Sequence, residues 1–365
     1  MALPPNLPAE GGAARRALAA LSPACFGMVM ATGIVSLAAW LMEMPSLAQG
    51  LFYLNIVLYV GLWAFTLARA SLCSKLFFGQ WADHSQGWGF LTAVAATGIV
   101  GEQFLFLAGW NQVAWVLWGL TLALWGVLMY AVLIALILKA EKPPLQRGIH
   151  GGWLLAVVAT QAVASLSISL SPHAGNQYGA PLAFLALAMW LLGGMLYILM
   201  MSLIFYRLVF FTLEPQDWVP PYWINMGAMA ISVLVGSTLI LQAPDAPHLA
   251  AILVFLKGFT VFYWAAGTWW IPVLIVVQVW RHGVRRYPLR YDVLYWSAVF
   301  PLGMYAASTH QMDVALELGF LIPLAYGFLY VAMLAWGVTF LAWALSTGRW
   351  LNQTAKAYDQ NSTDP

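Results

Sequence analysis

The chain has 365 residues, of which 62% are hydrophobic and only 8% are charged, with a formal net charge of +2. A soluble domain carries about a quarter charged residues, so this composition excludes an ordinary soluble enzyme. It also excludes an intrinsically disordered chain and a nucleic-acid-binding protein. With a mean hydropathy of +0.80, the sequence predicts an all-α polytopic membrane protein.

Ten apolar runs are long enough to cross a bilayer core of about 30 Å as helices, which takes about 20 residues. Turn residues and charges separate the runs. Residues 1–22 and 347–365 are expected to be tails, and 23–346 one transmembrane transporter or channel domain. The expected spans are 23–42, 47–69, 88–108, 111–138, 151–171, 178–206, 221–243, 249–280, 291–311 and 314–346.

The basic residues predict the orientation of these spans. Fourteen of the 15 Lys and Arg residues precede the first span, follow an even-numbered span or lie in the C-terminal tail. The positive-inside rule places such residues in the cytoplasm, so we expect both termini there and the protein in the cell inner membrane. The exception is Lys257, which we expect at the outer mouth. It either anchors its helix among the headgroups or attracts anions.

The spans pair into five helical hairpins, because the loops between odd and following even spans are short. Ala31–Val35 in the first span recurs as Ala96–Val100 in the third, and residues 159–163 form a degraded copy in the fifth. Such a period indicates a repeated supersecondary unit. The odd spans are also rich in Ser and Thr, which allow close helix packing. We therefore expect an inner ring of five odd helices around a pore and an outer ring of five even helices.

Five stretches stand out as motifs: Met30–Ser36, Trp223–Ser232, Phe300–Tyr305, Thr268–Pro272 and Trp280–His282. They resemble motifs of the tellurite-resistance/dicarboxylate transporter family, which includes plant slow-type anion channels, malate permeases and sulfite efflux pumps. The resemblance covers about residues 23–346. It implies a homotrimer of ten-helix protomers, each with its own pore lined by odd helices.

Phe300 and Pro301 in the ninth span are the strongest candidates for a functional site. A proline releases the carbonyl of residue i−4, here Ser297, and bends the helix. The neighbouring Phe300 could then close a narrow pore, because apolar constrictions gate by dewetting. The family resemblance implies the same role, since its anion channels have an occluding phenylalanine at the matching position. The alternative is a kinked helix with a packed phenylalanine.

Hydroxyl groups on the odd spans are the candidate pore lining, because these spans contain no Lys or Arg in their cores. Glu102 is the carboxylate that lies well inside an odd span, and intramembrane ionisable groups are functional candidates by default. It indicates either proton coupling or a wetted vestibule. The lining candidates are Thr32, Ser36, Thr97, Thr160, Ser165, Ser232 and Ser308.

The sequence contains no clustered Cys and His ligands and no P-loop, so we expect no metal, no cofactor, no catalytic residues and no enzyme activity. The preferred hypothesis is transport of small anions, most plausibly C4-dicarboxylates such as malate, through a pore gated by a phenylalanine. The expected partners are these anions and the lipid bilayer. The alternatives are sulfite or tellurite-linked anion efflux and, from a different class, an integral-membrane enzyme or a receptor.

Overall fold

The computed structural model describes residues 13–362, so parts of both predicted tails, 1–12 and 363–365, lie outside the described residues. The described chain consists of helices and their connections, without a strand. In this part of the chain, nine helical segments are long and apolar enough to cross a membrane. The prediction of an all-α polytopic membrane protein is confirmed.

Five buried helices form a closed inner ring. In chain order each contacts the next, and the last contacts the first. Small residues permit this close packing: a Cβ added to Gly227 would lie 2.7 Å from Cγ of Pro301 on the neighbouring helix. A 3₁₀ turn precedes each inner helix. The inner helices are α2 (Gly27–Leu41), α5 (Thr92–Gln103), α8 (Leu155–Leu170), α10 (Ile224–Gln242) and α13 (Trp296–Leu316).

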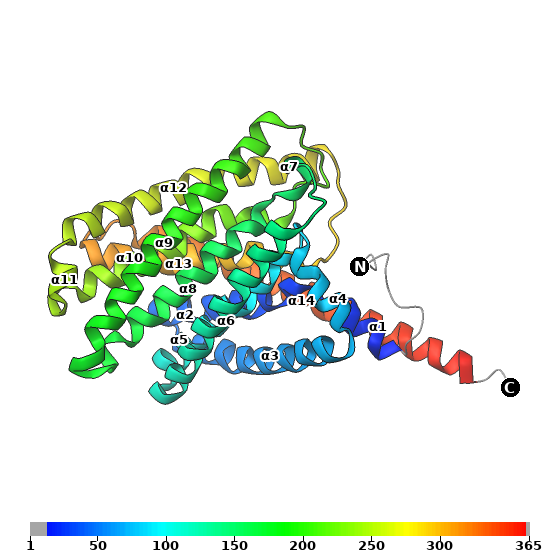
Figure 1. The fold of residues 1–365 in the computed structure, drawn as a ribbon, viewed down its shortest axis with the longest axis horizontal. Coiled ribbons are helices and arrows are strands. Elements are labelled where there is room, and N and C mark those ends of the chain that lie inside the picture. The colour runs from blue at the N-terminus through cyan, green and yellow to red at the C-terminus, as the bar shows by residue number, and fades with distance from the viewer. Residues whose placement is uncertain (1–12, 363–365) are drawn as a thin grey trace.

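Five longer helices surround the inner ring, and each packs against the inner helix that precedes it in the chain. Their outward positions carry exposed apolar side chains such as Val57, Val116 and Leu334, which suit contact with lipid. The red helix α14 extends beyond the bundle (Figure 1). The outer helices are α3 (Pro45–Leu72), α6 (Asn111–Leu138), α9 (Gly175–Phe210), α12 (Leu253–Val279) and α14 (Ile322–Ser362).

The connections contain short helical turns. The α-helical ones are α1 (Ala13–Ala19), α4 (Ser74–Gly79), α7 (Leu145–Gly148) and α11 (Pro247–Ala250). Two π-helical turns, η4 (Phe104–Ala108) and η9 (Trp280–Val284), extend α5 and α12. The 3₁₀ turns are η1 (Pro23–Phe26), η2 (Gln80–Ala82), η3 (Gly87–Leu91), η5 (Gly151–Leu154), η6 (Ser171–His173), η7 (Pro220–Trp223), η8 (Ala243–Asp245) and η10 (Val293–Tyr295).

The last hairpin differs from the expected boundaries. Its turn lies at residues 317–321, where the Asp313 carboxylate accepts backbone hydrogen bonds from Gly319 and Leu321 at 3.1 and 2.9 Å. The expected break near residue 312 was therefore wrong by several residues. With 21 residues α13 is long enough to cross a membrane, but it is not among the nine apolar segments. Polar residues such as Asp313 make α13 less apolar than these nine segments. An inner helix can keep them because it is surrounded by protein and not by lipid.

The connections lie at two opposite ends of the bundle. At the end that we call the basic end, residues 73–86, 139–150, 211–219 and 285–295 connect outer helices to the next inner helices. Hydrogen bonds join these connections: His150 contacts the Ser85 carbonyl at 3.0 Å, and Arg207 donates to the Gln146 carbonyl at 3.3 Å. At the opposite end, Gln242 donates to the Ile168 carbonyl at 2.8 Å. In Figure 1, α7 marks the basic end and α11 the opposite end.

Candidate functional site

A repeated polar contact joins the two rings. On each outer helix at least one aromatic side chain hydrogen-bonds the next inner helix in the chain, and the last outer helix returns to the first inner helix. Trp118 of α6 and Tyr197 of α9 make a second contact of this kind, with Ser167 and the Asn225 carbonyl. We call the five aromatic residues of the following pairs the aromatic belt. The pairs are Tyr59–Thr97 (2.9 Å), Trp125–Thr160 (2.9 Å), Trp190 with the Ser232 carbonyl (2.7 Å), Trp264–Thr309 (3.1 Å) and Trp336–Thr32 (2.9 Å).

The aromatic belt accounts for several hydroxyl groups that the sequence proposed as pore lining. The hydroxyls of Thr32, Thr97 and Thr160 are turned towards the outer helices and help to join the two rings. Ser36 also points outward, because it donates to the Ala48 carbonyl of α3 at 2.7 Å. A lining role for these four residues stays a prediction.

Ser232 and Ser308 satisfy their hydroxyls within their own helices. Ser232 donates to the Ala228 carbonyl at 2.8 Å and Ser308 to the Tyr305 carbonyl at 3.3 Å. Both side chains are fully buried in the inner ring. Their lining role also stays a prediction.

Phe300 lies on the inner side of α13. Thr309 faces the outer helix α12, where Trp264 donates to it. Phe300 precedes Thr309 by nine residues, or two and a half turns at 3.6 residues per turn, so the two side chains leave opposite faces of the helix. The Phe300 side chain is only 1% exposed. This geometry places a large apolar ring on the side of α13 that faces the inner ring.

Glu102 and Ser165 form a direct link between α5 and α8, because the Ser165 hydroxyl donates to the Glu102 carboxylate. Each residue lies five positions after a belt-bound threonine, Thr97 and Thr160, and five residues turn a helix by about 140°. Both side chains therefore leave the inward half of their helices. Glu102 is 5% exposed and Ser165 6% exposed. Among residues 13–362 no basic side chain forms an ion pair with Glu102.

Lys257 lies at the opposite end of the bundle, in the first turn of α12 after the 243–252 connection, and is exposed. It makes no ion pair within the described residues. A charge in this position contributes to the field outside the inner ring but touches none of the inner-ring candidates.

Positive charge gathers at the basic end. A cavity of about 470 Å³ there is lined by Lys139, Lys142 and Arg147, together with His84, Asp83 and Glu141. Burial lowers the pKa of His84, and the nearby charges of Lys139 and Lys142 lower it further. The neutral form of His84 is therefore favoured beside the lysines of this cavity.

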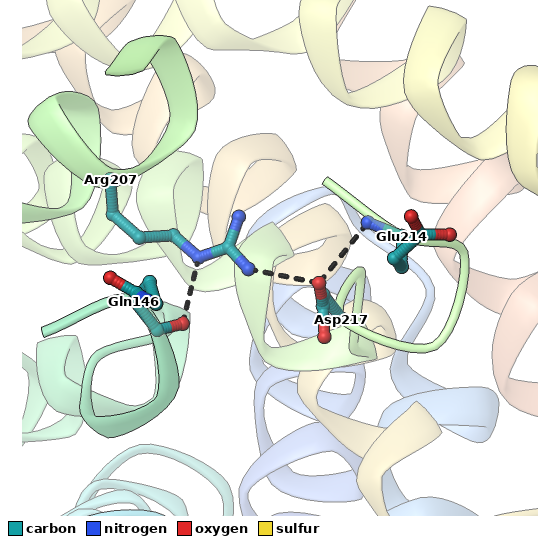
Figure 2. Close-up of polar contacts among 4 residues, drawn as sticks. All are labelled: Gln146, Arg207, Glu214 and Asp217. Atoms are coloured by element: carbon teal, nitrogen blue, oxygen red, sulfur yellow. Dashed lines mark hydrogen bonds and ion pairs between the residues drawn. The ribbon is translucent and has the colours of Figure 1, made fainter. Parts of the chain in front are cut away.

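Figure 2 shows the polar contacts that Arg207 makes at the basic end. This buried side chain donates to the Gln146 carbonyl of α7 and forms an ion pair of 3.1 Å with Asp217. The same carboxylate oxygen of Asp217 accepts the Glu214 backbone N–H at 3.1 Å. The contacts connect the end of α9 to two neighbouring connections, so Arg207 has a structural role.

The sequence reasoning missed the aromatic belt and the buried arginines. The belt residues recur at 59, 125, 190, 264 and 336, and this spacing resembles the hairpin period closely enough to have been noticed. The burial of Arg69, Arg207 and Arg281 leaves no comparable signal in the sequence. Within residues 13–362 the structure also brings no three His, Cys, Asp or Glu side chains together in a group that could hold a metal ion.

A closed ring of buried helices inside a lipid-facing ring, with positive charge gathered at one end, defines an integral membrane protein of the channel and transporter class. Residues 20–344 match the voltage-dependent anion channel family. The chain belongs to this family, which confirms the family resemblance and supports anion transport across a membrane.

Curated relatives agree with this assignment. An uncharacterized transporter of Methanocaldococcus jannaschii is 22% identical over 87% of this chain and 91% of its own length, and a second from the same organism is 21% identical over 87% and 92%. An uncharacterized membrane protein of Mycobacterium tuberculosis is 40% identical over 40% of this chain and 74% of its own length.

Proposed function

We propose that the protein conducts small dicarboxylate anions, C4-dicarboxylates such as malate, along the axis of the inner ring. The observation that carries the proposal is the position of Phe300 on the inner side of a closed five-helix ring in a member of an anion channel family. The resemblance to malate permeases favours C4-dicarboxylates over other small anions. Because the inner helices contain no Lys or Arg, selectivity would depend on the bore and on polar groups.

Phe300 and Pro301 form the proposed gate. Pro301 lies against Gly227 of α10, and the proposed proline bend of α13 lies at this contact. The ring of Phe300 beside this bend closes the path by excluding water, and a small rotation would open it. Glu102 and Ser165 form a second proposed functional site on the path of the anion, near the opposite end of the bundle. A deprotonated Glu102 repels anions, whereas a protonated one does not, so protons can be coupled to transport.

The proposed orientation has both termini and the basic end in the cytoplasm, with α13 as the tenth crossing. It is supported by the gathering of Lys and Arg residues at the basic end, and it makes the opposite end, with Lys257, the outer mouth. Further proposals are that the protein lies in the inner membrane as a homotrimer, as the family resemblance implies. Labelling of cysteines introduced at Arg285 and Asp245 tests the orientation, and labelling at 285 from outside intact cells would contradict it.

Flux into liposomes tests the proposed function. The purified protein is reconstituted, and uptake of malate, sulfite and chloride is measured with and without an imposed pH gradient. We expect malate flux to exceed that of empty liposomes and of a heat-inactivated sample. A higher sulfite flux would favour an efflux role. No anion flux under any condition would contradict the proposal.

A further inference from the structure

Arg281 is a buried cation without a polar partner in the part of the chain that the structure describes. Its side chain is 6% exposed, and its Nε and Nη1 atoms are buried without a hydrogen bond. No carboxylate forms an ion pair with it there, since the ion pair found joins Arg207 to Asp217. A buried charge normally requires a counter-charge and hydrogen bonds.

The two other buried arginines show what the fold supplies when a guanidinium is structural. Arg207 reaches a carbonyl and a carboxylate, and Arg69 donates from Nη2 to the Gln80 side chain. Each of these two arginines leaves one buried nitrogen without a hydrogen bond, whereas Arg281 leaves two and has no polar partner in the described chain. Arg281 has an aromatic ring instead, because its guanidinium carbon lies 4.4 Å from the centre of the Tyr287 ring. A ring face attracts the cation but cannot accept the hydrogen bonds in the guanidinium plane.

The position of Arg281 relates it to the inner ring. It belongs to the π-helical turn η9 at the end of α12, and such turns occur frequently at functional sites. Burial raises the pKa of Tyr295, the residue just before α13, and the nearby charge of Arg281 opposes this rise. Phe300 lies five residues further along this helix. The loop from α12 to α13 lies at the basic end, together with α7 (Figure 1).

We propose that Arg281, supported by Tyr287, binds a small soluble oxyanion at the basic end, next to the start of α13. The unpaired donors of the guanidinium supply charge-assisted hydrogen bonds to a carboxylate that reaches them, and the N-terminus of α13 adds positive potential. This binding site would concentrate the anion at the entrance that leads to Phe300. The link to transport rests on the proposed function, whereas the binding site itself does not.

Thermal stability with malate as the probe tests the site. An anion that binds the folded protein raises Tm with its concentration, so Tm is followed in detergent as malate is titrated at constant ionic strength. We expect a saturable rise in Tm for the natural protein and for Arg290→Gln, which removes the same charge from an exposed position of the connection that follows η9. Arg281→Gln should lose the rise, with an at least tenfold weaker apparent Kd. Its Tm without malate should fall only slightly, because the glutamine loses the contact with the Tyr287 ring but no ion pair or hydrogen bond of the described residues.

Other outcomes are decisive as well. The proposal would be overturned if malate raises the Tm of Arg281→Gln as much as that of the natural protein. It would also be overturned if Arg290→Gln loses the rise in Tm to the same extent as Arg281→Gln. Arg281→Lys covers the case in which Arg281→Gln fails to fold: it keeps the charge, and its apparent malate affinity should be intermediate. If Arg281→Lys binds malate as tightly as the natural protein does, the proposed site would be wrong.

A parallel series of Tm measurements with phosphatidylglycerol in the micelles distinguishes binding of a lipid headgroup from binding of a soluble anion. A rise in Tm with the lipid but not with malate would overturn the proposal. Absent flux combined with an Arg281-dependent rise in Tm would contradict only the proposed function.

Discussion

The indole Nε1 of Trp336 donates a hydrogen bond of 2.9 Å to the hydroxyl of Thr32, 304 residues earlier in the chain. The other four contacts of the aromatic belt run forward from an outer helix to the next inner helix. This contact runs back from the last outer helix α14 to the first inner helix α2, and it therefore closes the ring.

Trp336→Phe should destabilise the protein modestly. The change removes the donor and keeps most of the apolar surface, so the buried Thr32 hydroxyl loses a partner. Hydrogen bonds between membrane helices contribute about 0.6 kcal/mol on average, and we expect a loss of about 0.5–1.5 kcal/mol in the free energy of unfolding. Chemical unfolding in detergent measures it. Trp343→Phe on the same helix, where no hydrogen bond is found, is the control and should change stability less.

Phe300→Ala should raise anion conductance while leaving thermal stability near that of the natural protein. The reason is that a ring facing the path of the anion loses few packing contacts when it is removed. Planar bilayer recordings and Tm measured in detergent give both quantities.

Phe26→Ala is the matched control for a packed ring. Phe26 is also 1% exposed, but it packs against Tyr59 and Trp63 with ring centres 6.3 and 5.1 Å apart. Truncating a well-packed phenylalanine costs about 3–5 kcal/mol. If Phe300→Ala loses as much stability as Phe26→Ala and conducts no better, Phe300 is a packing residue and not a gate.

Glu102→Gln should remove the pH dependence of flux. Protonation of Glu102 removes a negative charge from the inward side of α5, so flux of the natural protein should rise as pH falls. The glutamine variant resembles the protonated state and should have high flux at all pH values. Glu43→Gln removes an exposed carboxylate at the same end and should keep the natural pH profile. An unchanged profile in Glu102→Gln would restrict Glu102 to a structural role.

At low ionic strength, Lys257→Glu should reduce the flux of anions that enter the protein from the end where Lys257 lies, opposite the basic end. The charge is exposed and acts at a distance, and the Debye length falls from about 30 Å at 0.01 M to about 10 Å at 0.1 M salt. We expect a clear loss of flux at 0.01 M salt and little effect at high salt, as measured by uptake into liposomes. Equal loss at both concentrations would indicate misfolding instead of steering.

The sequence by itself determined the class of protein, the helix pairs and the two ends of the bundle. The reason is that the free energy of placing apolar runs in lipid and charges outside it depends on composition along the chain and not on tertiary contacts. Nine of the ten expected spans overlap the membrane-crossing segments found, and Pro301 lies inside α13 as expected.

Only the tertiary structure decided which face of each inner helix points inward. Inner helices are buried on all sides, so their sequences lack the one-sided apolar pattern that reveals orientation. The sequence therefore identified Thr32, Thr97 and Thr160 only as hydroxyl-bearing residues of the inner helices, and the structure added that their hydroxyls hydrogen-bond aromatic side chains of the outer helices. The sequence likewise does not show that Arg281 lacks a hydrogen-bond partner in the described chain, because the packing of the whole chain determines which residues lie beside it.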